Sequence, residues 1–594
     1  MVNNSLVGQT LTSTFLSTAR DNATRVALRW QQGEAWNEWT WQDYADRVAQ
    51  AAAGLKAMGV GKGDRVVLMM RNRPEFHIAD VATMLCGATP VSIYNSSSPE
   101  QVQYLVNHCE AKVAIVEDGG FLDRIASVRS GLPKLERVVV IEMPDNPSQD
   151  LTPFSELVGT PPVDLDEACA IAEPNDIATI IYTSGTTGPP KGVVISHSNL
   201  CSTISNILGS LPKVGAGTRS ISFLPMAHIA ERMVTHYLPM GYGGEVTTCP
   251  DPALLSQYLG NVHPNVFLGV PRVWEKIYAG IQAVVSGDPE KKASLDQALQ
   301  VSAKVYELRE KGEPIPDELQ AGWEKAEVEG FSLLRGLVGL DAVEYALTGA
   351  APIPREVFNF FLWIGVPISE VYGLSESSGV ITWEVDKVRP GTVGRKLPGL
   401  ELRLGDDGEV LARGPGIFQG YLNDPEKTAE ALDSEGWLHT GDIGVLDEDG
   451  YLKIVDRKKE LIITAGGKNI SPANLEAALK SGALISQVCV IGDNQPFMSA
   501  LLTLDTEVLP VWAAQHGIKE TDMAALCAHP EVIAQVEKEV SDANAHFSRA
   551  EQIKKFVILS EEWAPDSEEL TPTMKLKRRG VAEKYADKIE NMYA

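Results

Sequence analysis

The sequence has few of the features that mark secreted, membrane-spanning or nucleic-acid-binding proteins. Its 594 residues contain 52 Lys and Arg against 79 Asp and Glu, for a net charge of −27. This acidic balance disfavours general nucleic-acid binding, which requires a broad basic face, and leaves only a small local basic patch open. The seven cysteines form no C-x-x-C pair, which argues against both a zinc site and a disulfide framework.

Long apolar runs are also missing. No stretch of about 18 apolar residues occurs, so we predict no transmembrane helix. The N-terminus lacks a basic segment followed by an apolar one, so we expect no signal peptide. We therefore expect a cytoplasmic protein with reduced thiols. These absences leave peripheral contact with a membrane open, and the oligomeric state cannot be read from the sequence.

What is present is the composition of a large globular protein. Hydrophobic residues make up 44% of the chain and charged residues 22%. A chain of this length exceeds one ordinary core, so we expect two or more domains. Predicted strands at 66–70 and 113–116 alternate with predicted helices at 44–58 and 74–86. This alternation favours an α/β fold built on a largely parallel, helix-covered sheet.

The domain organisation is predicted from a change in character late in the chain. The charged stretch 456–460 separates two apolar runs and reads as an exposed boundary. We predict a large domain over 1–455 and a smaller α+β domain over 456–594. A helical insertion is expected at about 281–330, where Asp288 is typical of a helix N-cap. The simplest interpretation is that this insertion is a surface element without a catalytic role.

The most informative segment is a loop of hydroxyls and glycines between two β-branched runs, at 182–191. Small hydroxylated residues and glycines let a backbone approach an anion closely, and Lys191 adds a positive charge. The loop is not of the Walker type, because Lys191 follows Pro190 and leads into a strand rather than a helix. The pattern predicts a phosphate-holding loop between two strands. A hairpin without special chemistry is the alternative.

This loop closely resembles the signature loop of the AMP-forming adenylating enzymes, which include acyl-CoA synthetases, luciferases and peptide-synthetase adenylation domains. The resemblance implies that the loop holds the phosphates of ATP. The residues assigned to the phosphates are Thr183, Ser184, Gly185, Thr186, Thr187 and Lys191.

A second segment, 372–376, resembles the part of the family that holds adenine and Mg²⁺. One carboxylate and one hydroxyl, from Glu376 and Thr183, suit the preference of Mg²⁺ for hard oxygen ligands. Taken alone, Glu376 reads as a surface carboxylate at a helix start. The resemblance also implies that a tyrosine ring stacks on adenine, which lies on a small-residue turn. The residues assigned to this pocket are Tyr372, Gly373, Ser375, Gly349, Ala350 and Ala351.

The block 437–459 strongly resembles the corresponding stretch of fatty acyl-CoA synthetases. By that match Asp442 binds the ribose, and a carboxylate suits a diol because it accepts two hydroxyl donors. Arg457 is placed near ribose and phosphate, with Lys459 nearby. The match makes Asp456 the hinge between the two domains.

The C-terminal segment 569–579 is basic within an acidic chain. It resembles the family pattern whose lysine contacts the reacting carboxylate and the α-phosphate, and this implies a catalytic role for Lys575. Met574 stands where the pattern has glycine, so Lys577 remains an alternative for the same role. The resemblance also assigns His228 to orientation of the acid rather than to base catalysis.

The resemblance further implies that the small domain rotates after the first step, replacing Lys575 by a segment that lines a thiol tunnel. The residues assigned to that tunnel are Gly466, Gly467 and Lys468. The leading hypothesis is a long-chain fatty acid–CoA ligase that uses fatty acid, ATP, Mg²⁺ and coenzyme A. The alternatives are a fatty acyl-AMP ligase that serves a carrier protein and a non-catalytic nucleotide- or lipid-binding protein.

Overall fold

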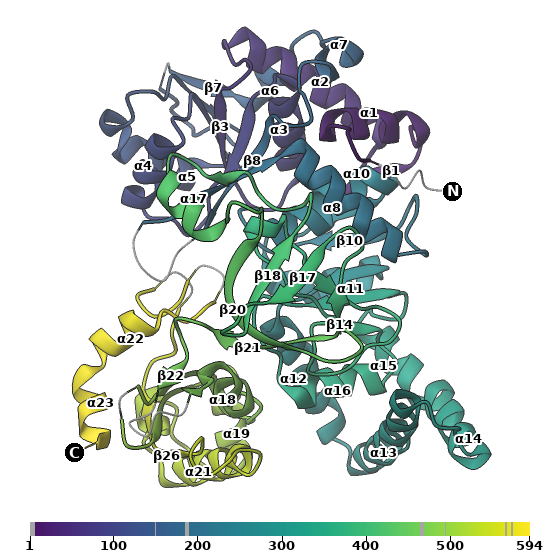
Figure 1. The fold of residues 1–594 in the computed structure, drawn as a ribbon, viewed down its shortest axis with the longest axis vertical. Coiled ribbons are helices and arrows are strands. Elements are labelled where there is room, and N and C mark those ends of the chain that lie inside the picture. The colour runs from purple at the N-terminus through teal and green to yellow at the C-terminus, as the bar shows by residue number, and fades with distance from the viewer. Residues whose placement is uncertain are drawn as a thin grey trace.

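The computed structural model describes residues 6–148, 150–183, 189–463, 469–493, 495–564, 567–571 and 574–593. The described chain is a mixed α/β structure in which the N-terminal sheets lie at one end and the C-terminal residues at the other (Figure 1). No described helix combines the length and the apolar character needed to cross a bilayer.

The first sheet is parallel throughout and has the strand order β4-β3-β5-β6-β7. Its strands are β3 (Arg65–Met69), β4 (Thr89–Ser92), β5 (Val113–Val116), β6 (Arg137–Val140) and β7 (Leu151–Pro153). The helices around it are α1 (Leu11–Asp21), α2 (Trp41–Ala57), α3 (Pro74–Leu85), α4 (Pro99–His108), α5 (Gly119–Ser127), α6 (Phe154–Leu157) and α7 (Leu165–Cys169). The central strands β3 and β5 are almost wholly apolar and buried, as expected for a sheet covered on both faces. The predicted strands and helices of this region are confirmed within a few residues.

Three further sheets extend the N-terminal part. A mixed sheet contains β10 (Arg219–Ser222), β11 (Glu245–Thr248), β1 (Val26–Gln32) and β2 (Ala35–Thr40) in that order. A parallel sheet contains β12 (Val266–Leu268), β13 (Tyr345–Thr348) and β14 (Ile368–Glu370). An antiparallel sheet contains β19 (Gly420–Tyr421), β9 (Lys191–Ser196) and β8 (Ile177–Thr183). The helices between them are α8 (His197–Ser210), α9 (Ile229–Arg232), the π-helix η2 (Met233–Tyr237), α10 (Leu238–Tyr242), α11 (Leu255–Val262) and α16 (Arg355–Trp363).

An antiparallel sheet follows at 401–457. Its order is β17 (Glu401–Leu404), β18 (Glu409–Arg413), β20 (Leu438–Leu446) and β21 (Leu452–Arg457). The short pair β15 (Thr382–Trp383) and β16 (Arg395–Lys396) precedes it, and α17 (Pro425–Ala431) lies between β19 and β20. Gly444 packs tightly here, because a Cβ at this position would come within 2.8 Å of both Leu452 and Val410.

The helical insertion is larger than predicted. It runs through α12 (Pro271–Ser286), α13 (Pro289–Lys311), α14 (Asp317–Ala326), the π-helix η4 (Glu327–Phe331) and α15 (Ser332–Leu337), and projects from the body in Figure 1. Asp288 caps α13 by accepting from the N–H groups of Glu290 and Lys291, as predicted. The prediction missed the first turns, because α12 has buried Pro271 and Trp274 and reads as part of the core.

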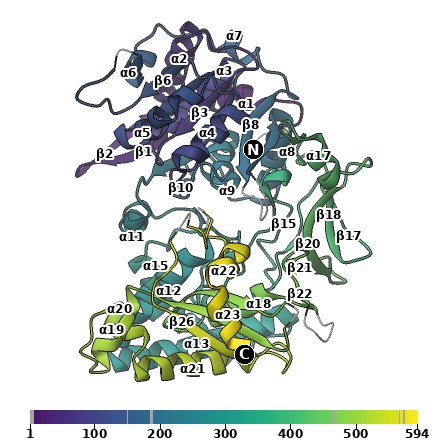
Figure 2. The same ribbon diagram turned by 90° about the vertical axis from the view of Figure 1, so that its left-hand side faces the viewer.

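The C-terminal residues form a small sheet with helices. Its strands are β24 (Ile485–Ile491), β25 (Met498–Leu504) and β26 (Ile553–Leu559), accompanied by the short pair β22 (Ile462–Ile463) and β23 (Asn469–Ile470). The helices are α18 (Pro472–Leu479), α19 (Val508–Gln515), α20 (Met523–Cys527), α21 (Pro530–Asn544), α22 (Arg578–Lys584) and α23 (Ala586–Tyr593). One apolar cluster draws all its fully buried members from 462–553. Figure 2 shows the segment ahead of α22 extending from this sheet toward the N-terminal part.

The stretch 456–460 is less exposed than predicted. Asp456 is buried, and its carboxylate accepts from the Ser471 hydroxyl at 2.6 Å and from the Ala473 N–H at 3.2 Å, at the start of α18. The three residues that follow are exposed. A charge can be buried here because the N-terminus of a helix supplies donors to it. The domain boundary and the hinge at Asp456 stay predictions.

Candidate active site

The predicted phosphate loop joins β8 and β9, which pair antiparallel. Thr183 ends the first strand, Lys191 begins the second, and the two lie opposite each other in the register. This strand–loop–strand arrangement is the one predicted, and it differs from the strand–loop–helix of a Walker site. Some predicted phosphate ligands lie outside the described residues, namely Ser184, Gly185, Thr186 and Thr187.

Tyr421 on β19 joins two of the predicted site residues. Its ring lies 4.7 Å from the Lys191 ammonium, and its hydroxyl donates to Glu376 Oε1 at 2.7 Å. A cation over a tyrosine face is attracted by the ring quadrupole. Tyr421 therefore holds the candidate metal ligand and the loop lysine on one side of the hairpin.

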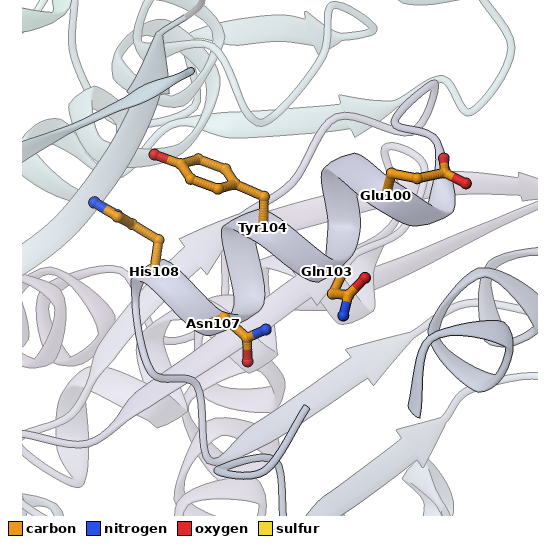
Figure 3. A pocket seen from close by; sticks show the side chains of 5 residues that line it. All are labelled: Glu100, Gln103, Tyr104, Asn107 and His108. Carbon is orange, nitrogen blue, oxygen red and sulfur yellow. The ribbon is translucent and has the colours of Figure 1, made fainter. Parts of the chain in front are cut away.

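The helix α4 supports the same hairpin from another side. The Tyr104 hydroxyl donates to the Pro190 carbonyl at 3.0 Å, and His108 Nδ1 lies 2.8 Å from the Tyr182 hydroxyl. Figure 3 shows Tyr104 and His108 projecting from one side of α4. These two residues help to line a surface hollow of about 450 Å³. The hollow is lined by α4 alone and contains none of the predicted ATP ligands.

The predicted adenine turn follows β13. Gly349 has no room for a side chain, because a Cβ would lie 2.8 Å from the Val371 carbonyl. Ala350 has φ of 70°, in the left-handed region that side chains other than glycine rarely adopt. Ala351 is exposed beside it. A tight turn of small side chains leaves a flat surface open, which suits a purine.

The segment that follows β14 forms the other side of the predicted adenine pocket. A Cβ on Gly373 would lie 2.3 Å from the Gly379 carbonyl, so only glycine fits. Ser375 is buried at the start of a 3₁₀ turn, Ser375–Ser377, that places Glu376. The Tyr372 hydroxyl donates to Asp442 Oδ2 at 2.7 Å. The predicted adenine and ribose residues therefore meet in space although they lie 70 positions apart.

Asp442 is buried on β20 and faces Arg457 on β21, with Oδ1 of the carboxylate 3.2 Å from Nε of the guanidinium. Burial raises the pKa of Asp442, while Arg457 and Tyr372 oppose that rise. Tyr372 donates to one carboxylate oxygen and Arg457 faces the other, so each oxygen keeps capacity for a further donor. The arrangement can therefore accept a diol without losing either internal contact.

The charges of these residues also act on Lys575 of the C-terminal segment. Desolvation lowers the pKa of Lys575 although part of its side chain meets solvent, and Arg457 lowers it further. Asp442 and Glu376 oppose the change. The Lys575 ammonium therefore responds to the charges of three predicted nucleotide ligands, and the phosphates of ATP would raise its pKa again.

The neighbouring Lys577 has a different partner. Its ammonium donates to the Ser567 carbonyl at 2.8 Å, within the C-terminal residues. Met574 has φ of 61°, so the residue that replaces glycine in the family pattern still adopts the backbone conformation that favours glycine. The side chain of Met574 packs against an apolar cluster of the C-terminal sheet, which offsets the strain.

His228 caps the short helix α9, where its Nδ1 accepts from the Ala230 N–H at 3.2 Å. The ring proton therefore lies on Nε2. Burial lowers the pKa of His228 to about 3, and Lys575 contributes to that lowering. A neutral imidazole with a free N–H donor can orient a carboxylate, but it carries no positive charge at neutral pH.

Comparisons with known proteins show the family of this chain. The profile of the AMP-binding enzyme family matches residues 15–422, and that of the AMP-binding enzyme C-terminal domain matches 459–594. The chain belongs to the AMP-binding enzyme family. It is 38% identical over 566 residues to the long-chain-fatty-acid–CoA ligase FadD15 of Mycobacterium bovis, covering 94% of this chain and 92% of the relative.

Other relatives lie further away. This AMP-binding enzyme is 34% identical to the long-chain-fatty-acid–CoA ligase ACSBG2 of Xenopus laevis, over 99% of this chain and 84% of the relative. The crystal structure of the anthranilate CoA ligase AuaEII in complex with anthranoyl-AMP superposes with a TM-score of 0.74 at 21% identity, over 98% of both chains. The fold class predicted from the sequence, a large α/β domain with a smaller C-terminal domain, is confirmed.

The predicted site of this AMP-binding enzyme assembles only in part within the described residues. Lys459 is exposed, and the pKa of the Glu430 carboxyl is lowered mainly by Lys427, with smaller contributions from Lys191 and Lys459. The predicted tunnel residues Gly466, Gly467 and Lys468 lie outside the described residues. No group of three or more His, Cys, Asp or Glu suited to a metal occurs in the part of the chain that the structure describes.

Sequence reasoning missed several residues of this enzyme's site. Tyr421 and Tyr104 carry no local signal, because each is a single tyrosine whose partner is distant in the chain. Glu370 was also missed, at the end of β14 opposite Thr348, where burial raises its pKa to about 7. The available signal was a charged residue at the end of an apolar strand, next to the segment 372–376.

Proposed function

We propose that this AMP-binding enzyme joins a long-chain fatty acid to coenzyme A while ATP is converted to AMP and pyrophosphate. The observation that carries the proposal is the meeting of predicted nucleotide ligands that are distant in the chain, because Tyr372 donates to Asp442 and Tyr421 joins Glu376 to Lys191. The relatives named long-chain-fatty-acid–CoA ligases match 94% or more of this chain and support the choice of acid and acceptor.

In the first step a carboxylate oxygen of the acid attacks the α-phosphorus of ATP. A new P–O bond forms, the bond to the bridging oxygen breaks, and pyrophosphate leaves with the electron pair. The acid is already an anion, so no general base is required. Catalysis of this kind depends on positioning and on neutralising spread charge. Lys575 and Lys191 supply positive charge, and His228 Nε2–H donates to the carboxylate.

The described residues fit a Mg²⁺ ion. Glu376 is a half-buried carboxylate held at one oxygen by Tyr421, and Thr183 ends the strand that leads into the phosphate loop. A carboxylate and a hydroxyl, completed by phosphate and water, form a usual Mg²⁺ ligand set. When bound there, the ion would neutralise phosphate charge. The adenosine is bound by the turn at 349–351, with the ribose on Asp442.

In the second step the thiol of coenzyme A loses its proton and attacks the acyl carbon. A C–S bond forms, the bond from that carbon to the AMP oxygen breaks, and AMP leaves. We assign Gly466, Gly467 and Lys468 to the thiol approach, as the family resemblance implies.

The decisive experiment measures AMP, pyrophosphate and acyl-CoA with a series of fatty acids from short to very long, with and without coenzyme A. Formation of acyl-CoA with long acids supports the proposal. An acyl-adenylate that reacts with a carrier protein but not with coenzyme A would identify an acyl-AMP ligase. Absence of any pyrophosphate release dependent on fatty acid would identify a non-catalytic binding protein.

A further inference from the structure

An ion cluster joins the helical insertion to the C-terminal residues. Arg272, on the first turn of α12, reaches across to Asp505 with 2.6 Å between Nη2 and Oδ2. The same nitrogen lies 3.8 Å from Glu562 Oε1. Lys276, one turn further along α12, pairs with Glu507 at 3.2 Å. Figure 2 shows α12 beside the C-terminal sheet at this junction.

The Arg272–Asp505 pair is the better buried of the two contacts. The side chains of Arg272 and Asp505 are 27% and 11% exposed, against 55% and 76% for Lys276 and Glu507. The Asp505 carboxylate is also fixed from its own side, because Oδ1 accepts from the N–H groups of Glu507 and Val508 at the start of α19. An ion pair that is partly buried and held in place restricts the relative orientation of two segments more strongly than an exposed pair does.

Both ends of the pair are tied to the candidate active site. Two residues beyond Arg272, the buried Trp274 donates to the Leu347 carbonyl, directly before the adenine turn. On the other side, Arg578 pairs with Glu476 through two hydrogen bonds of 2.6 and 2.7 Å. That bidentate pair anchors the segment carrying Lys575 to the C-terminal sheet.

We propose that Arg272, through Asp505 and Glu562, is a positioning residue that holds the C-terminal residues where Lys575 reaches the nucleotide pocket. The inference rests on the proposed function, because it assigns Lys575 to the first step. Loss of the Arg272 charge should lower the rate of adenylation about 10-fold, since the observed orientation loses its main ion pair. Transfer from a supplied acyl-adenylate to coenzyme A does not use Lys575 and should keep its rate.

The test compares the two half-reactions in Arg272→Gln, Asp505→Asn and the charge exchange Arg272→Asp with Asp505→Arg. Arg20→Gln is the matched control, because Arg20 makes a single 2.7 Å pair with Asp166 far from this junction. We expect both single variants to lose pyrophosphate release selectively and the exchange to recover at least half of it. Equal losses in the two half-reactions, wild-type adenylation in Arg272→Gln, or no recovery on exchange would each overturn the proposal.

A second measurement does not depend on catalysis. All seven native cysteines are buried, so dyes can be attached selectively to cysteines introduced at exposed Lys134 and Lys554. Energy transfer between the dyes should be narrowly distributed in the wild type and broadened by Arg272→Gln. An unchanged distribution contradicts the positioning role even if the wild type proves inactive on fatty acids. Inactivity of the wild type would by itself refute only the proposed function.

Discussion

At the scale of single residues, the site depends on side chains that hold other side chains. Tyr421 donates to Glu376 and lies under Lys191, and Tyr372 donates to Asp442. Each tyrosine fixes one carboxylate oxygen, and in Asp442 the other oxygen faces Arg457. The candidate ligands are thereby oriented before ATP arrives, which lowers the entropy lost on binding.

Replacing Tyr421 by Phe tests this support without removing the ring beneath Lys191. Loss of the hydroxyl frees the Glu376 carboxylate to rotate, and outer contacts of this kind tune metal affinity. We expect the Mg²⁺ concentration for half-maximal pyrophosphate release to rise about 10-fold. The control Tyr104→Phe, which acts on the Pro190 carbonyl, should leave the Mg²⁺ titration unchanged. An unaltered titration in Tyr421→Phe would exclude a role in holding the metal ligand.

The neutral state of His228 has consequences for pH dependence. Its pKa is about 3 in the folded protein and about 6.5 in an unfolded chain, so the fold favours the neutral form. This contribution to stability is complete above pH 6.5 and is lost as the pH falls from 6.5 toward 3. We expect His228→Ala to lower adenylation about 100-fold, as loss of a positioned donor does, without changing the shape of the pH–rate profile between pH 5 and 8. An inflection near pH 6.5 present only in the wild type would show that His228 titrates during catalysis.

At the scale of elements, a buried ion network joins the phosphate hairpin to the helix that carries His228. Arg232 of α9 pairs with Asp80 of α3 and donates to Thr179 of β8 at 2.8 Å. His236 contacts the same carboxylate at 2.9 Å. Both Arg232 and Asp80 are fully buried. These contacts fix α9 against β8. They support the residues proposed to act on the substrate and do not act on it themselves.

Asp80→Asn should destabilise the protein strongly, because it leaves the Arg232 charge buried without a counter-ion. Breaking such a pair costs about 3–5 kcal/mol. The exposed pair Arg413–Glu401 is the comparison, and Arg413→Gln should cost under about 1 kcal/mol. Urea denaturation followed by tryptophan fluorescence measures both. Similar stabilities for the two variants would mean that the network contributes little to the fold.

At the scale of the whole molecule, the proposed site combines a lysine from the last part of the chain with residues from its middle. Lys575 comes from the C-terminal residues, whereas Glu376, Asp442 and the hairpin belong to earlier parts of the chain. The chemistry therefore depends on how the C-terminal sheet is placed as a body. This gives the two half-reactions different requirements.

Lys575→Ala should abolish adenylation and spare thioester formation from supplied acyl-adenylate, because the ammonium acts at the α-phosphate only. The measurement is pyrophosphate release in one assay and acyl-CoA formation in the other. Lys577→Ala is the control, since that lysine contacts the Ser567 carbonyl. Equal loss in both half-reactions of Lys575→Ala would contradict the assignment, as would a matching loss in Lys577→Ala.

Much of the fold was predictable from local pattern. The strands at 65–69 and 113–116, the cap at Asp288 and the strand–loop–strand hairpin follow from apolar runs, capping chemistry and glycine content, all of which act over a few residues. The insertion was misjudged, because the first turns of α12 are buried and resemble core. The stretch 456–460 was predicted to be exposed. That prediction was wrong at Asp456, whose carboxylate accepts hydrogen bonds from residues at the start of α18.

By itself the sequence determined the family and the types of residue that the chemistry uses, because a phosphate loop and its flanking strands are encoded in consecutive positions. Only the tertiary structure decided which residues meet. It paired the Lys577 ammonium with the Ser567 carbonyl, set Tyr421 between Lys191 and Glu376, and paired Arg272 with Asp505 across 233 positions. Contacts between distant residues depend on how whole sheets pack, and local sequence carries no record of that packing.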